Sequence, residues 1–199
     1  MTGIRQFDEK DVLNQATNVF WQRGYERTAI QDLVEATGVG RGSLYNAFGD
    51  KEQLFLAVLD YYQETVVLSL TAFLSDPNPY CALERLLNAI VERMSDPTYP
   101  PGCLYTNTLI ECSARDEVIR RKSTAVLGSL ESAIYQVLHR AQIEGMLDPR
   151  QDIRALARFF VGITQALAVL SKAFADPSVL KNVVKVAMSV WDTSSIVND

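Results

Sequence analysis

The sequence predicts an all-α protein, and three observations support this fold class. Apolar residues recur with helical spacing along most of the chain, and no segment shows the sustained alternation expected of a strand. The apolar runs are bounded by Gly, Pro or Asp of the kinds that end or begin helices. Hydrophobic residues make up 48% of the 199 residues, enough to bury a core. We expect about nine helices, arranged as a three-helix domain (residues 1–50) and a larger helical domain (residues 51–199).

The first predicted helix begins at Asp8 or Asp11 and ends at Gly24, because an acidic N-cap and a C-terminal glycine are typical helix boundaries. Arg23 lies in the last turn, where a cation interacts favourably with the helix dipole. Its apolar face consists of Val12, Leu13, Ala16, Val19 and Phe20.

The segment from Thr28 to Lys51 carries the most specific functional signal. We expect the Thr28 hydroxyl to cap a short helix, and Gly38 to end that helix in the left-handed conformation. A second short helix fits residues 41–48, with Leu44 pointing inward. Two short helices joined by a tight glycine turn form the helix-turn-helix layout, whose second helix enters the DNA major groove.

The rest of the chain is predicted to form longer helices separated by Asp-Pro and Gly breaks. These helices cover residues 51–74, 80–94, 104–114, 116–144, 149–175 and 177–191. Asp148 and Pro149 are expected to start the penultimate helix, and the proline-rich segment 96–102 is the strongest loop. We expect the boundary between the two parts of the chain to lie inside the long helix that begins at Lys51.

The charge balance excludes a protein that grips nucleic acid through bulk positive charge. The formal net charge is −5, and residues 1–50 hold five Lys and Arg against seven Asp and Glu. Contacts with DNA must therefore come from a few placed side chains and helix N-termini.

Cysteine usage and hydropathy predict a cytoplasmic, reduced protein without a membrane partner. Cys81, Cys103 and Cys112 have no metal-ligand spacing, so we expect neither a metal nor a cofactor. The charged segment 8–11 interrupts any early apolar run, which argues against a signal peptide. No uninterrupted apolar stretch approaches the roughly 20 residues needed to span a bilayer.

A set of residues between positions 8 and 56 follows one known pattern in order and spacing. The matching residues are Phe20, Gly24, Tyr25, Thr28, Ile30, Leu33, Ala36, Gly38, Val39, Gly42, Leu44, Tyr45, Phe48, Lys51, Glu52 and Leu54. This pattern resembles the TetR/AcrR family of transcriptional regulators, although many members carry Ser at the position of Gly40. The resemblance implies a repressor that binds a palindromic DNA operator as a homodimer and is released by a small molecule in its C-terminal domain.

The resemblance and the helix-turn-helix layout together give a set of candidate DNA-binding residues. These are Arg5, Thr28, Arg41, Gly42, Ser43, Tyr45, Asn46 and Lys51. Arg41 lies in the first turn of the recognition helix, and arginine can form two parallel hydrogen bonds with guanine. Gly42 lets the backbone approach the groove, and Lys51 with the polar side chains is expected to hold phosphates. The alternatives are an ordinary surface charge for Arg41 and core packing for Tyr45.

Apolar stripes on the last two long helices predict a homodimer interface. The predicted interface residues are Leu156, Phe159, Phe160, Ile163, Leu167, Leu170, Val179, Val183, Val186, Ala187 and Val190. Gly162 and Ala166 would permit close helix approach, and two such helices from each subunit would form a four-helix bundle, as the family resemblance also implies. The alternative is that both stripes face the subunit's own core.

The middle helices, residues 80–145, are the expected effector site by analogy with the family. The candidate residues are Cys103, Leu104, Tyr105, Asn107, Thr108, Glu111, Tyr135 and Gln165. Cys103 falls near a helix N-terminus, where the helix dipole favours the thiolate. A Cys103 switch that senses electrophiles or redox change is therefore an alternative trigger, and a small buried hydrophobic residue is the other interpretation of this cysteine.

Two further function classes remain to be weighed. Catalysis would have to use His139, and no nucleophile motif surrounds this histidine. The glycine-rich segment 38–42 follows no strand and fits neither phosphate-loop fingerprint, so we expect no enzyme. A helical interaction protein that has lost DNA binding is the remaining alternative, and only the acidic charge balance favours it.

Overall fold

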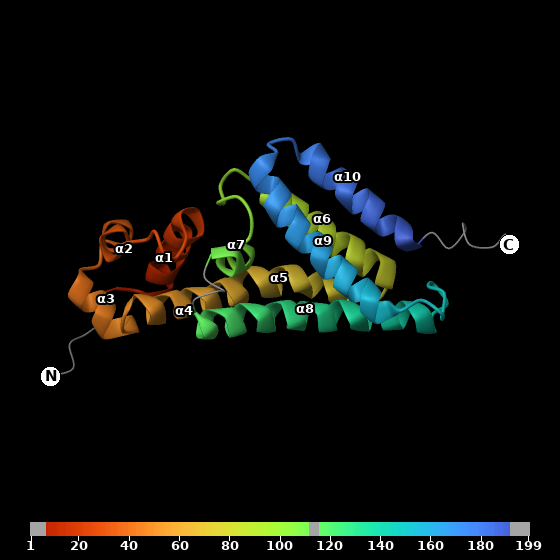
Figure 1. The fold of residues 1–199 in the computed structure, drawn as a ribbon, viewed down its shortest axis with the longest axis horizontal. Helices are drawn as coiled ribbons and strands as arrows, with labels where there is room; N and C mark the ends of the chain where they lie inside the picture. The colour runs from red at the N-terminus through yellow and green to blue at the C-terminus, as the bar shows by residue number, and fades with distance from the viewer. Residues whose placement is uncertain (1–6, 112–115, 192–199) are drawn as a thin grey trace. The chain divides into compact units, whose positions relative to one another are not determined.

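The computed structural model describes residues 7–111 and 116–191, and these residues form helices and connecting turns without a β-strand (Figure 1). The prediction of an all-α fold is confirmed. Arg5, a predicted DNA contact, lies outside the described residues. Cys112, to which the sequence assigned no role, lies outside them as well.

The chain divides into two compact units. The first comprises Met1–Val67 and Cys103–Ser123, and the second comprises Leu68–Gly102 and Thr124–Asp199. The first unit contains α1 (Glu9–Arg23), α2 (Ile30–Thr37), α3 (Arg41–Phe48), α4 (Lys51–Tyr62), the π-helical segment η1 (Gln63–Val67), α7 (Leu104–Glu111) and the first turns of α8 (Glu117–Ile143). The second contains α5 (Leu68–Thr71), the 3₁₀ segment η2 (Ala72–Ser75), α6 (Pro79–Ser95), the rest of α8, α9 (Ile153–Ala173), α10 (Pro177–Met188) and the 3₁₀ segment η3 (Ser189–Trp191).

The boundary between the compact units falls inside the long helical run that begins at Lys51. The run expected over residues 51–74 changes to π-helical geometry at Gln63–Val67, and the first unit ends there. Compactness thus groups α7 with the N-terminal helices although it lies much later in the chain. The functional division at residue 50 stays a prediction.

Most helix boundaries in the N-terminal region agree with the sequence signals. The Asp8 carboxylate caps α1 by accepting from the Lys10 amide at 2.8 Å. Gly24 ends α1, and Gly38 ends α2 in the left-handed conformation with φ 65°. Gly40 is the N-cap of α3, which begins at the next residue as predicted.

The capping role predicted for Thr28 is wrong. Ala29 is the N-cap of α2, and the Asp32 carboxylate accepts from the Ala29 amide at 2.8 Å. The Thr28 hydroxyl instead donates to the carbonyl oxygen of Gly24 at 2.6 Å, and the side chain is buried. The hydroxyl turns back toward the end of α1 because the Gly24 carbonyl there still needs a donor.

The predicted start of the penultimate helix is also wrong. α9 begins at Ile153, and the Asp152 carboxylate caps it by accepting from the amides of Arg154 and Ala155 at 3.0 Å each. The Asp148 carboxylate is occupied by the side chain and amide of Arg150, and these hydrogen bonds lower the pKa of Asp148 to about 2. Asp148 therefore stabilises the turn before α9, and Asp152 is the N-cap of this helix.

Aromatic rings fill the centre of the first unit. The ring centroid of Phe55 lies 4.8 Å from that of Phe20 and 4.7 Å from that of Tyr25. Trp21 meets Tyr62 edge-on at 5.1 Å. Helix α1 packs against α2 and α4, while α3 contacts α2 and α4. The aromatic side chains of α1 and α4 thus form the base on which the helix-turn-helix rests.

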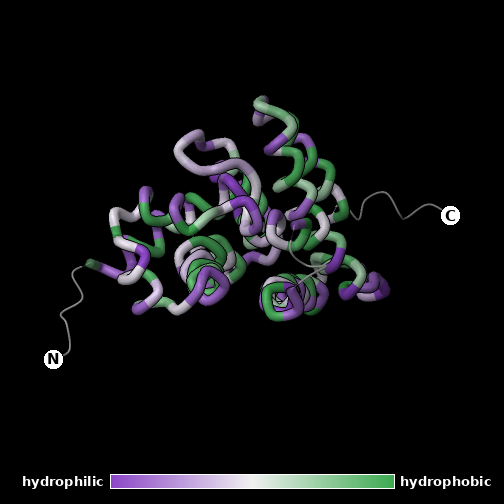
Figure 2. The backbone as a smooth tube through the Cα atoms, turned by 60° about the vertical axis from the view of Figure 1, so that its left-hand side comes forward, coloured by the Kyte–Doolittle hydropathy of each residue, from purple (hydrophilic) through white to green (hydrophobic). Residues whose placement is uncertain are grey.

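In the second unit, α6, α9 and α10 pack against one another (Figure 1). Leu86 and Leu87 of α6, Phe160 and Leu167 of α9, and Ala187 of α10 are buried in one core. Hydrophobic and hydrophilic residues alternate around the helical turns (Figure 2), as expected for amphipathic helices that each cover one side of a core.

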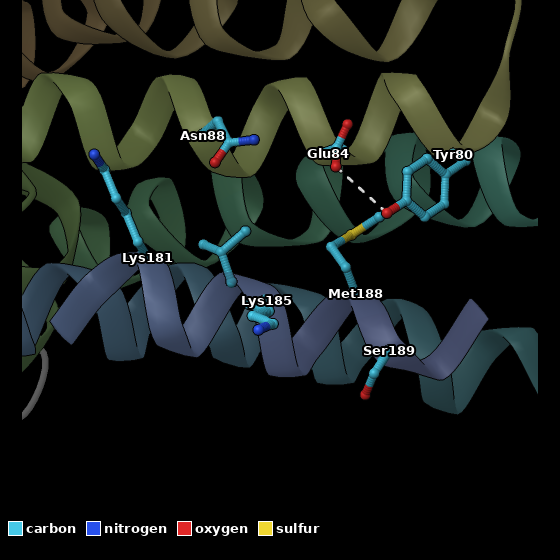
Figure 3. Close-up of a pocket in the computed structure, with 8 residues that line it drawn as sticks. Tyr80, Glu84, Asn88, Lys181, Lys185, Met188 and Ser189 are labelled. Atoms are coloured by element: carbon cyan, nitrogen blue, oxygen red, sulfur yellow. Dashed lines mark hydrogen bonds between the residues drawn. The ribbon is translucent and has the colours of Figure 1, made fainter. Parts of the chain in front are cut away.

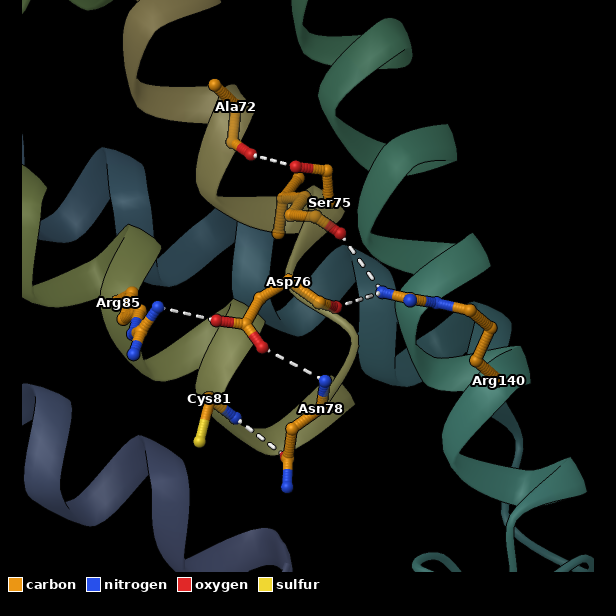
Figure 4. Close-up of polar contacts among 8 residues, drawn as sticks. Ala72, Ser75, Asp76, Asn78, Cys81, Arg85 and Arg140 are labelled. Carbon is orange, nitrogen blue, oxygen red and sulfur yellow. Dashed lines mark hydrogen bonds and ion pairs between the residues drawn. The ribbon is translucent and has the colours of Figure 1, made fainter.

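An arginine of α8 holds the turn between η2 and α6 (Figure 4). The Arg140 guanidinium donates to the carbonyl oxygens of Leu74 at 3.0 Å and Asp76 at 3.1 Å. The Asp76 carboxylate in turn pairs with Arg85 at 2.6 Å. The unpaired carbonyls at the end of a helix need donors, and Arg140 supplies them from a distant helix.

Helix α9 is long and apolar enough to cross a membrane by length and composition alone. The charged residues Arg154, Arg158 and Lys172 interrupt the apolar run within α9, so the expectation that no uninterrupted apolar stretch reaches roughly 20 residues holds for this helix. A core helix of a soluble protein passes the same test, and Phe160 and Leu167 of α9 lie in the core of the second unit.

Candidate DNA-binding interface and effector region

Helix α3 has one fully buried side chain and an exposed polar face. Leu44 is 0% exposed and anchors the helix to the first unit. The exposed candidate residues of this helix are Arg41, Gly42, Ser43 and Asn46. Because the anchor lies on one side and the polar groups lie on the others, α3 can enter a DNA groove without leaving its own core.

The first turn of α3 is open to an approaching partner. A Cβ atom placed on Gly42 would meet nothing within 4 Å, so no internal packing requires glycine there. The Arg41 guanidinium carbon lies 5.2 Å from the ring centroid of the half-buried Tyr45. This cation–π contact orients Arg41 along its own helix. The DNA contacts predicted for these residues stay predictions.

The other two described candidates are placed differently. The Lys51 ammonium lies 4.6 Å from the ring centroid of Tyr25, at the start of α4. Thr28 is 1% exposed, so any contact of this residue with a phosphate has to come through the backbone around it. Both contacts remain predictions, as does that of Arg5.

Acidic groups gather at the N-terminus of α4, beside the recognition helix in sequence. The Asp50 carboxylate caps α4 by accepting from the Gln53 amide at 2.9 Å. The Asp116 carboxylate raises the pKa of Glu52, with smaller contributions from burial, a hydrogen bond to Asp116 and the charge of Asp50. The first turn of α4 is therefore a local concentration of negative charge.

The structure places the α7 candidates inside the first unit, where internal hydrogen bonds occupy the hydroxyls of Tyr105 and Thr108. Leu104, Tyr105 and Thr108 are buried. The Tyr105 hydroxyl donates to the carbonyl oxygen of Leu59 at 2.9 Å, and burial raises the pKa of this hydroxyl. The Thr108 hydroxyl donates to the Leu104 carbonyl at 2.7 Å. Asn107 is half-buried, and its backbone N–H donates to the Cys103 carbonyl oxygen at 2.9 Å.

The predicted position of Cys103 at a helix N-terminus is confirmed. α7 begins at Leu104, and the hydrogen bond from the Asn107 amide makes Cys103 the residue that opens this helix. Cys103 is half-buried, and the Tyr62 hydroxyl lies 3.8 Å from its sulfur. Its role in an effector site or as a reactive thiol stays a prediction.

The two remaining effector candidates lie in the second unit. The Arg154 guanidinium carbon lies 4.3 Å from the ring centroid of Tyr135, which also stacks on His139 at 6.1 Å. The Gln165 side chain donates to the Thr164 hydroxyl at 3.0 Å. Thr164 precedes Gln165 directly and His139 lies one helical turn after Tyr135, whereas Arg154 comes from another helix and could not be read from local spacing.

A groove between α6 and α10 was not anticipated (Figure 3). It has a volume of about 350 Å³ and is lined by Tyr80, Glu84, Asn88, Lys181, Val184, Lys185, Met188 and Ser189. The Tyr80 hydroxyl donates to the Glu84 carboxylate at 3.3 Å inside it. A smaller groove of about 270 Å³ lies among residues 94–101 and 171–180. None of the predicted effector residues lines either groove.

The predicted interface residues fall into a buried and an accessible group. Phe160, Leu167 and Ala187 belong to the subunit's own core, so the alternative interpretation applies to these three. Phe159 and Val186 are 43% and 70% exposed. The half-buried members are Leu156, Ile163, Leu170, Val179, Val183 and Val190. Part of the accessible surface of α9 and α10 is thus apolar, and the interface itself stays a prediction.

Two more exposed apolar residues extend this surface. Val169 is 48% exposed on α9, and Phe174 is 50% exposed just beyond the end of that helix. A Cβ atom on Gly162 would meet nothing within 4 Å, so this face of α9 is open to close approach. In the described part of the chain, no group of three or more His, Cys, Asp or Glu residues is arranged to hold a metal ion.

Two family models match the chain in regions that correspond to these structural parts. The model described as "Bacterial regulatory proteins, tetR family" matches residues 12–58, which include most of α1 and all of α2 and α3. The model described as "Tetracyclin repressor-like, C-terminal domain" matches residues 79–187, more than half of the chain.

Curated relatives match over nearly the full length. The chain is 33% identical over 190 residues to the uncharacterized HTH-type transcriptional regulator YezE of Bacillus subtilis, covering 94% of this chain and 98% of YezE. It is 30% identical over 187 residues to the HTH-type transcriptional repressor ComR of Escherichia coli, covering 93% and 89% of the two chains.

Solved structures share the fold and include complexes with DNA. A cysteine-substituted variant of the TetR family regulator CifR, complexed with 26-base-pair operator DNA, superimposes with a TM-score of 0.88 at 30% identity, covering 94% of this chain and 99% of the other. A TetR regulator from Chloroflexus aurantiacus gives 0.86 at 25% identity, covering 96% and 98%. The exposed helix-turn-helix, the two family models and these relatives agree that the chain belongs to the TetR family of DNA-binding transcriptional regulators and is not an enzyme.

Proposed function

We propose that the protein is a cytoplasmic homodimeric repressor that binds a palindromic operator and is released by a small molecule bound to its C-terminal helices. The exposed polar face of α3, held by the buried Leu44, is the observation that carries this proposal. A single α3 reads few base pairs, so two copies on half-sites about one helical turn apart are needed for useful specificity.

The two functions are assigned to two consecutive parts of the chain, as predicted from the sequence. Residues 1–50 bind DNA and residues 51–199 bind the effector and the second subunit. Arg41 reads a base edge, and Lys51 neutralises a phosphate at the start of α4. The other proposed contacts are Arg5, Thr28, Gly42, Ser43, Tyr45 and Asn46. The repressor ComR supports the sign of regulation, and the CifR complex supports double-stranded operator DNA as the partner.

The test is a fluorescence anisotropy titration with DNA selected by the protein from a random-sequence pool. We expect tight binding to the selected sequence, weak binding to its shuffled version, and a steep loss of affinity between about 50 and 200 mM salt. Equal affinity for selected and shuffled DNA contradicts the proposal and favours the interaction protein without DNA binding.

The dimer is tested separately by light scattering on the purified chain. We expect twice the mass of 22.2 kDa, and a Phe159→Asp variant that shifts to the monomer because it places a charge on the exposed face of α9. A wild-type monomer at micromolar concentration contradicts the proposed interface.

Covalent modification of Cys103 is a second candidate trigger, favoured by the position of its sulfur at the start of α7 beside the Tyr62 hydroxyl. An electrophilic alkene such as N-ethylmaleimide tests it. The thiolate forms a C–S bond at one alkene carbon, and the other carbon takes a proton from water.

The experiment uses a Cys81→Ser, Cys112→Ser background, in which Cys103 is the one remaining thiol of the sequence. We expect alkylation to release operator DNA, and no release when Cys103 is also replaced by Ser. An unreactive Cys103, or full release by the reagent in the Cys103→Ser variant, contradicts this trigger.

A further inference from the structure

One carboxylate of α7 reaches the turn that leads into the helix-turn-helix. Glu111, the last residue of α7, accepts a hydrogen bond from the Tyr25 amide on Oε2 and another from the Glu26 amide on Oε1, each 2.9 Å long. The partners lie 86 and 85 residues away in sequence. A single side chain therefore satisfies two successive backbone donors between α1 and α2.

The turn is shaped to receive an anion. Gly24 ends α1 with φ 85°, so the chain leaves the helix there, and the next two backbone amides are the two that donate to Glu111. Successive amides that point the same way form a concave anion site, and a carboxylate with one oxygen for each amide fits it. Hydrogen bonds to an ionised group are among the stronger ones in proteins.

The Glu111 carboxylate lies directly against the Cα atom of Gly24. A Cβ atom built on this residue would lie 2.3 Å from Oε2 and 2.7 Å from Oε1 of Glu111. The carboxylate thus occupies the space where any other side chain would begin. The turn and Glu111 are complementary in shape as well as in charge.

The same turn sets the start of α2. The Thr28 hydroxyl donates to the Gly24 carbonyl at 2.6 Å, and the Tyr25 ring packs against Phe55 of α4. The Arg23 guanidinium pairs with Asp32 of α2 at 2.5 Å. The turn that Glu111 holds leads directly into α2, and α2 packs on the recognition helix α3.

Helix α7 is held in the first unit by contacts with α1 and α4. The Tyr105 hydroxyl donates to the Leu59 carbonyl of α4 at 2.9 Å, and α7 packs on both α1 and α4. Glu111 therefore joins a helix supported by α4 to the turn before α2. These two hydrogen bonds, with the packing of α7 on α1, connect α7 to that turn.

We propose that Glu111 is a positioning residue, which fixes the turn between α1 and α2 against α7 and thereby places the recognition helix for the operator. This inference rests on the proposed operator binding and deepens it. It assigns the residue a role different from that of lining an effector site.

The test compares two variants of the full chain. Glu111→Gln keeps the size of the side chain but turns one of its two acceptors into a donor that faces a backbone amide. Glu64→Gln, at an exposed position of the same unit, is the matched control because it makes the same change in net charge. A general effect of charge on DNA binding is therefore equal in both.

Affinity is measured for the DNA selected by the wild type and for its shuffled version. We expect Glu111→Gln to bind the selected DNA roughly tenfold or more weakly, while its affinity for shuffled DNA stays within about twofold of wild type. Glu64→Gln should stay within about twofold of wild type on both. A side chain that only stabilises the fold would lower the thermal midpoint and leave the ratio of the two affinities unchanged.

Amide hydrogen exchange gives a second readout at the site. We expect exchange at Tyr25 and Glu26 to accelerate about tenfold or more in Glu111→Gln, without faster exchange in the core of α4. If Glu111→Gln does not fold, Glu111→Asp replaces it, because the shorter carboxylate keeps its charge but cannot reach both amides.

The outcomes separate the two proposals. If the wild type selects no sequence, the proposed function fails. If the wild type selects an operator and the folded Glu111 variant retains the wild-type affinity ratio, the inference alone is overturned.

Discussion

Helices α3 and α7 are both eight residues long and both belong to the first unit, yet they use their polar groups in opposite ways. In α3 only Leu44 is fully buried, and Arg41, Ser43 and Asn46 face solvent. In α7 the Tyr105 and Thr108 hydroxyls bond to carbonyl oxygens. A helix that recognises a partner exposes its polar groups to solvent, whereas a helix that holds other elements in place uses its polar groups in hydrogen bonds inside the protein.

The largest expected effect concerns the anchor of α3. Leu44→Ala should lower the free energy of unfolding by about 2–5 kcal/mol, because it removes buried methyl groups and leaves a cavity. Leu68→Ala, at a side chain that is 55% exposed, is the control and should cost less than about 0.5 kcal/mol. Denaturant unfolding measures both. Equal losses would mean that α3 does not depend on its single anchor.

The next effect tests the outward face of α3. Arg41→Ala should weaken operator binding by about 1–3 kcal/mol and relax the preference at one base pair, because a bidentate contact is lost. Anisotropy titrations with the operator and its single-base variants measure this loss. Arg121→Ala removes the same charge from a side chain that is 74% exposed and pairs with Glu117, so it should leave affinity nearly unchanged.

Lys51→Ala distinguishes a phosphate contact from a base contact. It should weaken all DNA sequences about equally and reduce the salt slope by about 1. Operator binding that is unchanged in both Arg41→Ala and Lys51→Ala would remove the assignment of α3 as the recognition helix.

A smaller effect tests the inward face of α7. Tyr105→Phe should lower the free energy of unfolding by about 1 kcal/mol, because it removes one buried hydrogen bond to Leu59. The Leu59 carbonyl keeps a partner, since the Gln63 amide also donates to it, which holds the cost near this value. Tyr99→Phe, at a 41% exposed side chain, is the control. A thermal midpoint equal to that of the control would contradict the role of this hydroxyl.

The smallest effect concerns the acidic cluster at the start of α4. The Asp116 carboxylate raises the pKa of Glu52 above its ordinary 4.5, so the folded chain holds this proton more tightly than the unfolded chain. The favourable contribution is fully present below pH 4.5 and is lost as the pH rises through the folded value. At pH 7 the ionised pair repels.

Glu52→Gln should therefore raise the thermal midpoint at pH 7 by about 1 °C, because exposure to solvent screens the repulsion. The gain should shrink as the pH falls below 4.5, where Glu52 is neutral in the wild type as well. Thermal melts at several pH values measure this. A gain independent of pH would show that the Glu52–Asp116 repulsion is not its source.

The parts of the site that the sequence predicted correctly depend on neighbours in the chain. The bounds of α3, the left-handed Gly38 and the cap at Asp8 follow from residues within one or two turns. The two wrong cap assignments also come from rules that consider only neighbouring residues. Thr28 and Asp148 are reasonable caps by local rules, but Gly24 and Arg150 take their polar atoms.

The distinction between core and surface on the C-terminal helices shows the limit of periodicity. Phe159 and Phe160 are adjacent and equally apolar, yet the first is 43% exposed and the second is 0% exposed. A broad apolar stripe does not say which edge of it meets the subunit's own core. The packing of α6, α9 and α10 decides that.

The sequence by itself determined the all-α class, the helix-turn-helix and the family, because helical periodicity, capping residues and motif spacing are local properties of the chain. Only the tertiary structure decided what α7 does. Its Glu111 meets amides 85 and 86 residues away, and its Tyr105 meets a carbonyl 46 residues away. Contacts over such separations depend on how the helices pack, and no local pattern around Glu111 encodes the turn that it holds.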